Sequence, residues 1–245
     1  MLFEINYMTN IFKNTKKKKT RFFEIYIPKI LKTVNSTGGI TLNAKQQMNS
    51  VLCIISKLLA DKTNYLTVLS EKKTISEKEI YNSVKLFLEG QLFFNADKKG
   101  KKAIEEYIKN KDKKSLSKQE KSKLYFPPSI GEKFLRNFGN NKIMISNNAP
   151  IYFSGVIEYL AYEILDNSYL QAKDKKHVRI TVRDMELGVR NDLELNNFFN
   201  KQRISFLGGG IVPFIHPKLL LKKSGKYKLR NNSENTDNKN KRFKP

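Results

Sequence analysis

The order of hydrophobic and polar positions divides the chain into two regions with the same plan of helices. In the first region, the mostly apolar residues 21–34 are followed by the turn sequence NSTGG, which predicts a short helix. From Asn43 to about Leu69 the apolar residues recur in steps of three and four, which predicts one long helix with an apolar stripe. Ser76 and Glu79 then form a capping-box pattern ahead of a third, short helix. A stripe that long needs a partner helix across it.

The second region repeats this plan. Residues 124–138 predict a short helix followed by a loop. Asn148 can cap the next, long helix, with Pro150 in its first turn, where the missing N–H costs nothing. After the basic loop AKDKKHVRI, Thr181 and Asp184 repeat the capping spacing ahead of a last short helix. Each region therefore predicts a short helix, a long helix and a short helix, so the arrangement of helices repeats within the chain.

The basic residues indicate a class of partner, because they are concentrated in three segments. Lys and Arg number 47 against 23 Asp and Glu, for a formal net charge of +24. Residues 1–21 carry six basic residues against one acid, residues 98–123 eleven against four, and residues 222–245 nine against two. A compact protein with this excess is expected to act on a polyanion, with nucleic acid the leading candidate and an anionic membrane surface the alternative. Only eight of the basic residues are Arg, and this bias favours sequence-neutral contact with phosphates.

Charge and apolar patterning together predict the organisation of the chain. We expect basic tails at its two extremes and two helical domains joined by a linker. The predicted segments are a tail at 1–21, a domain with an added C-terminal helix at 22–110, a linker at 111–123, a domain at 124–200, a docking segment at 201–223 and a tail at 224–245.

Several classes of function lack support in the sequence. Cys53 is the single cysteine, so no disulfide can form within the chain, and His177 and His216 have no Cys or His neighbours at metal-ligand spacing. No phosphate-binding loop or nucleophile–base constellation is present, and the glycines at 208–210 lack the strand-to-helix context of such a loop. The apolar runs are short for a membrane span, and the N-terminus has no signal-peptide core. We therefore expect no enzyme activity, no cofactor, no metal and no membrane partner.

Particular strings of residues resemble one protein family. NNAPIYFSGVIEYLAYEILDNS, VRITVRDMELGVRNDLELN and LGGGIVPFIHPKLL resemble the long helix, the second loop with third helix, and the docking tail of histone 2A. IYIPKILKTVNSTGGI and KKTISEKEIYNSVKLFLEG resemble histone 2B. The match covers about 22–110 and 124–222, and this order in one chain resembles the histone doublets of large (giant) DNA viruses. The resemblance implies an all-α protein whose two histone folds pair, long helix across long helix, as an intramolecular handshake pseudo-dimer.

The resemblance also implies where DNA would bind. In the family, the first loop of one partner lies beside the second loop of the other, and each pair grips phosphates. Arg179 matches an arginine that the family inserts into the minor groove. Met144 stands where the family usually has an arginine, so we expect weaker binding at that loop. The implied DNA-binding residues are Lys19, Arg21, Thr41, Lys72, Lys73, Thr74, Lys133, Arg136, Lys142, Lys175, Lys176 and Arg179.

A second implied site is an acidic patch, which in the family binds basic peptides. Leu193, Gln91 and Lys99 stand where the family has acids, so we expect a smaller and less negative patch. A solvated acidic face is the alternative interpretation. The residues that match the patch are Glu158, Glu163, Asp166, Asp192 and Glu194.

The third implied site docks on other histones. The string GGGIVPFIHPKLL is too rich in Gly and Pro for a helix and too apolar for a free tail. It resembles the segment that lies on a histone-3/histone-4 pair. The implied docking residues are Leu66, Leu69, Gly209, Ile211, Val212, Pro213 and Ile215.

These expectations combine into a structural chromatin protein that wraps and compacts DNA with little sequence preference. Its expected partners are double-stranded DNA, a histone 3/histone 4-like dimer or doublet, and a second copy of itself in an octamer-like particle. It would act on chromatin in a host nucleus or a virus factory, and in the virion if it is viral. The alternatives are a histone-fold transcription regulator and a general basic nucleic-acid-binding protein. The docking string argues against the first, and the second would need exposed aromatic platforms, whereas the aromatic residues mostly fall on the predicted buried stripes.

Overall fold

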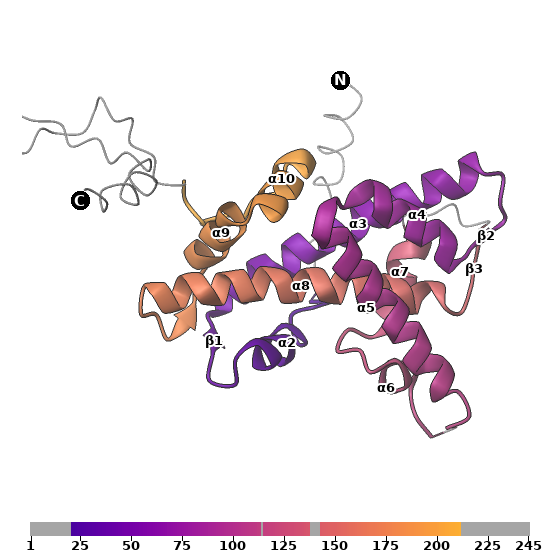
Figure 1. Ribbon diagram of the computed structural model, residues 1–245, viewed down its shortest axis with the longest axis horizontal. Helices are drawn as coiled ribbons and strands as arrows, with labels where there is room; N and C mark the ends of the chain where they lie inside the picture. The colour runs from indigo at the N-terminus through magenta and orange to yellow at the C-terminus, as the bar shows by residue number, and fades with distance from the viewer. Residues whose placement is uncertain (1–20, 114, 138–142, 212–245) are drawn as a thin grey trace, which may run out of the picture. The chain divides into compact units, whose positions relative to one another are not determined.

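Helices form most of the chain, and in each half a long helix lies between two short ones (Figure 1). The computed structural model describes residues 21–113, 115–137 and 143–211. The first half holds α2 (Ile27–Val34), α3 (Leu42–Leu69), α4 (Glu77–Phe87) and α5 (Gly90–Lys109). The second half holds α7 (Pro128–Asn137), α8 (Ala149–Asp174), α9 (Val182–Asn191) and α10 (Leu193–Gln202). A short helix, α6 (Lys118–Ser122), lies between the two halves.

The predicted helix starts are confirmed in most places. Both capping boxes form: the hydroxyls of Ser76 and Thr181 accept backbone N–H groups, and Glu79 and Asp184 accept the N-cap N–H groups in return. Asn148 is the N-cap residue of α8 and Pro150 lies in the first turn, as predicted, but the Asn148 side chain makes no capping hydrogen bond. Its Nδ2 instead lies 3.5 Å from Oε2 of Glu77 in the other half of the chain.

The first short helix is shorter than the apolar string that predicted it. Residues 22–26 form turns, and the helix begins only at Ile27. The Phe23 N–H donates to Oδ1 of Asn49 at 2.9 Å, so this turn is tied to α3. Apolar content alone does not mark a helix start; the Pro in the first turn of α2 marks it better.

The apolar stripe of α3 is buried along most of the helix and exposed at its end. Met48, Leu52, Ile55 and Leu59 are fully buried, and each such side chain contributes roughly 1.5–3 kcal/mol of hydrophobic stabilisation. The stripe ends at Leu69, which is 67% exposed. The last turn of α3 is therefore an apolar surface within the described residues.

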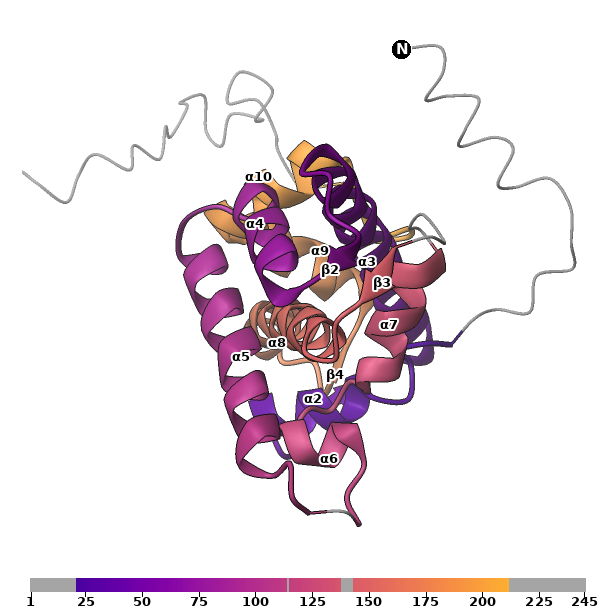
Figure 2. The ribbon, with the colours of Figure 1, turned by 90° about the vertical axis from the view of Figure 1, so that its right-hand side faces the viewer.

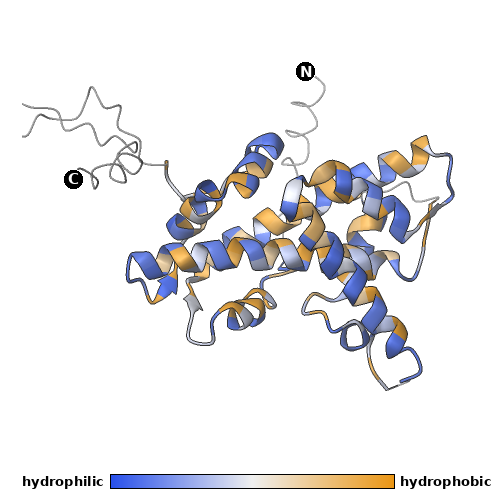
Figure 3. Cartoon of the chain, in the orientation of Figure 1, coloured by the Kyte–Doolittle hydropathy of each residue, from blue (hydrophilic) through white to orange (hydrophobic). Residues whose placement is uncertain are grey.

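Helix α8 forms the centre of the packed helices. Figure 2 looks nearly along α8 and shows other helices on several of its sides, and α8 contacts α2, α3, α4, α5, α7 and α9. A helix packed on many sides needs apolar or small residues around most of its circumference. That requirement is met by Ile151, Phe153, Val156 and Leu160 together with the buried Gly155. The outer helices, by contrast, carry hydrophobic and hydrophilic residues together (Figure 3).

Two glycines allow α5 and α8 to approach closely. A Cβ on Gly155 would lie 3.0 Å from the Cα of Gly100, and a Cβ on Gly100 would lie 2.7 Å from the ring of Tyr152. Neither glycine has a positive φ, so the constraint is the space between the helices. The helix pair is therefore packed backbone against backbone at this point.

Short strands join the loops of the two halves. Strand β1 (Gly39–Ile40) pairs in parallel with β4 (Arg179–Ile180), with Gly39 opposite Arg179. Strand β2 (Thr74–Ile75) pairs in parallel with β3 (Met144–Ile145), with Thr74 opposite Met144. Each pair takes the loop before a long helix from one half and the loop after a long helix from the other.

The segment expected to be a linker folds back on α5. Ser117 and Glu120 form a capping box that starts α6. Lys123 pairs with Glu106 at 2.9 Å, and the Asn110 amide donates to the carbonyl of Lys121 at 3.2 Å. The described residues up to Gly210 belong to one compact unit; of the second unit, which begins at Ile211, only Ile211 is described.

Candidate nucleic-acid interface

In the first paired loop, the basic segment that follows α3 lies beside strand β3, which precedes α8. Lys73 and Thr74 are exposed, and the Lys73 carbonyl accepts the N–H of Met144 at 2.9 Å. Met144 is 72% exposed, so the loop offers an apolar side chain here. Lys142, expected beside this loop, lies outside the described residues. Among the described residues of this loop, the exposed Lys73 is the unpaired cation that could contact a phosphate.

Lys72, by contrast, is held by a buried acid. Its ammonium forms an ion pair with Glu79, whose side chain is 4% exposed. Burial acts to raise the pKa of Glu79, but hydrogen bonds from Lys72 and Ser76 outweigh it and lower that pKa to about 2. This pair fixes the loop between α3 and β2, and a phosphate must compete with Glu79 for Lys72.

The second paired loop carries Arg179 opposite Gly39. The Thr41 N–H donates to the carbonyl of Ile180 at 3.0 Å, and the Thr41 hydroxyl caps α3 by accepting from Ala44. Arg179 and Lys176 are exposed, and neither forms an ion pair with a described residue. A Cβ on Gly39 would lie 3.0 Å from the Arg179 Cγ, so the glycine leaves room for the arginine stem.

Lys175 repeats the arrangement of Lys72. Its ammonium pairs with Asp184, a fully buried carboxylate that also lies 3.1 Å from Nδ1 of His177 and accepts from Thr181. The two halves thus use the acid of a capping box to hold a lysine of the preceding loop. Sequence reasoning missed both acids as partners, although the capping-box pattern had already picked them out.

The remaining basic candidates lie on or next to short helices. Arg21 pairs with Glu24 at 3.4 Å, Arg136 pairs with Glu132 at 2.8 Å, and both arginines are exposed. Lys133 on α7 is exposed. Lys19 lies outside the described residues. Pairs made by solvent-exposed cations are weak, so they leave both arginines able to exchange their carboxylate for a phosphate.

Two of the five acidic candidates are used inside the protein. Glu158 is 2% exposed; its carboxylate accepts the N–H groups of Tyr125 and Phe126 and lies 2.9 Å from the Lys99 ammonium. Glu194 accepts the N–H groups of Gln91 and Leu92 at the start of α5. Glu194 and the Lys99–Glu158 ion pair link the two halves of the chain, and Glu158 also holds the segment before α7.

The other three acidic candidates gather on α8 and before α10. Burial raises the pKa of Glu163, and the neighbouring carboxylates of Asp192 and Asp166 raise it further. Asp192 also caps α10 by accepting the Leu195 N–H at 2.7 Å. Leu193, between two of the acids, is 73% exposed. The described acidic surface is therefore small, with an apolar side chain beside it.

The docking candidates fall into two groups along the chain, one at the end of α3 and one after α10. Leu66 is half-buried and Leu69 is exposed at the end of α3. Gly209 is buried against α9: a Cβ there would lie 2.6 Å from the Cβ of Glu186, and its carbonyl accepts from Arg183 at 2.8 Å. Ile211 is 89% exposed. Val212, Pro213 and Ile215 lie outside the described residues.

Other kinds of site receive no support from the described residues. Within 21–113, 115–137 and 143–211, no cluster of three metal-ligating side chains is present. No helix in the same ranges is long and apolar enough to cross a membrane. Cys53 is half-buried, and burial raises the pKa of its thiol to about 12, so it carries little thiolate at neutral pH.

Comparison with known proteins finds relatives in one family. Residues 97–191 match the family model of the core histone domain, which is common to histones 2A, 2B, 3 and 4. One histone 2A of Lodderomyces elongisporus is 43% identical over 112 residues, which cover 46% of this chain and 84% of that protein. One histone 2A of Candida albicans is 42% identical over 115 residues, covering 47% of this chain and 85% of that protein. The crystal structure of the histone from Methanopyrus kandleri aligns with a TM-score of 0.45 and 15% identity over 69% of this chain and 93% of that chain.

Proposed function

This chain belongs to the histone family, and on that premise we propose that it wraps double-stranded DNA as the 2B–2A component of a nucleosome-like particle. Members of the family are structural DNA-packaging proteins, so the chain is a structural chromatin protein and not an enzyme. The proposal adds that its two halves act as a doublet, with residues 22–110 in the 2B role and residues 124–200 in the 2A role.

The observation that carries the proposal is the reciprocal pairing of the loops. β1 pairs with β4 and β2 pairs with β3, so each half supplies one loop to each pair. Two loops joined by strand hydrogen bonds hold their cations at fixed positions, as phosphate contacts require. The pairing would place Lys73 at one end of the pseudo-dimer and Lys176 with Arg179 at the other.

The charges favour backbone contact with little sequence preference. Lys73, Lys176 and Arg179 are exposed and form no ion pair with a described residue, whereas Lys72 and Lys175 are held by buried acids. Contacts made mainly by lysine neutralise phosphates and release counterions, which gives high affinity at low salt and a steep loss of affinity as salt rises. We propose Arg179 as the side chain that enters the minor groove.

A further part of the proposal concerns protein partners. The apolar end of α3, with Tyr65, Val68 and Leu69 exposed, and the exposed Ile211 would contact a histone 3/histone 4-like dimer or doublet. A second copy of this chain would complete an octamer-like particle. The order of the two halves points to the doublets of large DNA viruses, so the DNA would be a viral genome in a nucleus, a virus factory or a virion.

The experiment that tests this proposal is nuclease protection. The chain is mixed with a histone 3/histone 4-like partner and long DNA and digested with micrococcal nuclease. A discrete fragment of roughly 120–150 bp that requires both proteins is the expected result. Samples lacking the partner serve as controls. A smear, or the same protection without the partner, would contradict a nucleosome-like role and leave only a basic DNA coat.

A further inference from the structure

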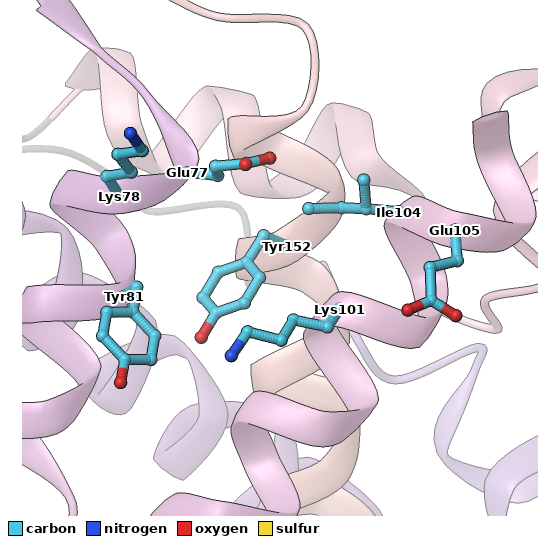
Figure 4. A pocket seen from close by; sticks show the side chains of 7 residues that line it. All are labelled: Glu77, Lys78, Tyr81, Lys101, Ile104, Glu105 and Tyr152. Carbon is cyan, nitrogen blue, oxygen red and sulfur yellow. The ribbon is translucent and has the colours of Figure 1, made fainter.

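A pocket of about 340 Å³ lies where α4, α5 and α8 meet, next to the paired strands β2 and β3 (Figure 4). It is lined by Glu77, Lys78 and Tyr81 of α4, by Lys101, Ile104 and Glu105 of α5, and by Tyr152 of α8. The volume falls at the lower end of the range of about 300–1,000 Å³ typical of ligand sites, which suits one side chain or a small ligand. The two tyrosine rings and Ile104 supply apolar walls, and four of the seven lining residues are charged, two of each sign.

The two aromatic walls are fixed by contacts outside the pocket. Tyr152 is 2% exposed, and its hydroxyl donates to Oδ1 of Asp97 at 2.7 Å. The half-buried ring of Tyr81 packs against Phe93, with 5.7 Å between the ring centroids. Because Asp97 and Phe93 hold the two rings in place while the pocket is empty, binding requires little loss of side-chain entropy at the tyrosines.

The pocket already accommodates one ammonium group on an aromatic ring. Nζ of Lys101 lies 5.0 Å from the centroid of Tyr81, within the range of a cation–π interaction. The same Nζ lies 2.7 Å from Oδ2 of Asp97, so the charge of Lys101 is compensated inside the protein. The ammonium of Lys78, by contrast, is directed away from the two tyrosine rings (Figure 4).

The carboxylates of the pocket lack such compensation. Neither Glu77 nor Glu105 forms an ion pair with a residue of the described chain, although Asn148 contacts Glu77 at 3.5 Å. Two uncompensated carboxylates beside aromatic and aliphatic walls favour a cation on an apolar stem. In a chain with a net charge of +24, these carboxylates lower the local repulsion that a cationic partner would otherwise meet.

We propose that this pocket binds a lysine side chain carried by a basic segment of another polypeptide. The ammonium would lie between Glu77 and Glu105, and the alkyl stem would lie along Tyr81 and Ile104. A free metal ion or ammonium ion would leave the apolar walls unused, and an anion would face two carboxylates. The lining includes none of the loop cations Lys73, Lys176 and Arg179, so the inference does not depend on how the chain wraps DNA.

A peptide-binding experiment with the full chain tests the proposal. The probe is a fluorescein-labelled peptide with the sequence of residues 10–21, NIFKNTKKKKTR, and its control is the same peptide with every Lys replaced by Gln. We expect Tyr81→Ala to weaken binding about 3–10-fold and Glu77→Gln with Glu105→Gln to weaken it by a similar factor. Tyr81→Phe keeps the ring and should bind as the unmodified chain does, which separates loss of the ring from loss of folding.

A second variant removes the resident ammonium. Lys101→Ala vacates the face of Tyr81 and leaves Asp97 uncompensated, so the peptide should bind about 3–10-fold more tightly. Tyr162→Ala, at an exposed tyrosine elsewhere on α8, is the matched control and should change nothing. Binding lost in Glu163→Gln but kept in Tyr81→Ala would assign the peptide to the acidic surface and overturn the proposal. Equal binding of the Gln-containing peptide would overturn it too.

Discussion

The ammonium of Lys175 lies 2.9 Å from Oδ1 of Asp184, a carboxylate that the fold buries completely at the start of α9. His177 and Thr181 contact the same carboxylate, so three side chains of one loop converge on one acid. This relationship ties the order of the loop that carries Lys176 and Arg179 to the ionisation of Asp184.

Folding stability should therefore fall in acid as Asp184 becomes protonated. Burial acts to raise its pKa, but hydrogen bonds from Lys175, Thr181 and His177 lower it from 3.8 to about 2. Because the folded-state pKa is the lower one, the contribution is complete above about pH 4 and is lost as the pH falls towards 2. Asp184→Asn should be less stable than the unmodified chain at pH 7 and equally stable near pH 2. Urea unfolding followed by circular dichroism measures both, and a pH-independent difference would contradict the assignment.

Arg179→Ala should loosen DNA without loosening the fold. Arg179 is exposed and pairs with no described acid, so its loss removes a phosphate contact and leaves no buried charge unpaired. The slope of log affinity against log salt should fall by about 1. Titrations of DNA at several salt concentrations measure it, with Lys111→Ala, an exposed lysine outside the paired loops, as the control. An unfolded Arg179→Ala chain, or an unchanged salt slope, would contradict the proposed phosphate contact of Arg179.

Gly100→Ala should destabilise the chain by about 1–3 kcal/mol, the usual cost of overpacking. The added methyl would lie 2.7 Å from the Tyr152 ring, which is fixed by Asp97 and has little room to move. At Gly38 a Cβ would meet its neighbours at 3.5 Å or more, an ordinary contact, so Gly38→Ala is the matched control. Denaturant midpoints compare the two, and equal midpoints would show that α5 and α8 can separate freely.

Glu158→Gln and Glu163→Gln should have opposite effects on stability. Gln at 158 would leave Tyr125 N, Phe126 N and Lys99 competing for a single carbonyl oxygen, at a cost of about 1–3 kcal/mol. Glu163 is different, because burial and then neighbouring carboxylates raise its pKa. A raised pKa means that folding disfavours the charged acid, so removing the charge should raise the midpoint at pH 7. Thermal unfolding of both variants at pH 7 provides the test; a stabilised Glu158→Gln would contradict the internal role of Glu158.

Local patterns predicted the helices well where each signal was repeated. The structure confirms the apolar spacing of three and four in α3 and both capping boxes. These patterns were predictable because they depend on residues close in sequence within one helix. Asn148 is at the predicted N-cap position but makes no capping bond, because its backbone is already helical, whereas a capping side chain needs an extended backbone. The helix α6 was overlooked inside a basic stretch, although Ser117 and Glu120 carry the same capping spacing.

Charges were harder to predict than helices. The sequence places Glu158 and Glu163 on one face of α8, but it does not tell which neighbour each carboxylate meets. Glu158 faces backbone N–H groups from residues more than thirty positions away, and Glu194 faces the start of α5. Lysine counts likewise do not show that Lys72 and Lys175 are held by buried acids whereas Lys73 and Lys176 are not.

The central position of α8 sets the timing of folding during synthesis. The stripe of α3 is complete once about seventy residues have been made, yet α8 and the strands that pair with β1 and β2 come from residues 144–180. At about 5–20 residues per second, the ribosome needs roughly 5–20 s to supply them. During that interval α4 can cover part of α3, but the surfaces of α3 that meet α7, α8 and α9 have no native partner. We therefore expect chaperones to bind the nascent chain until the second half is made.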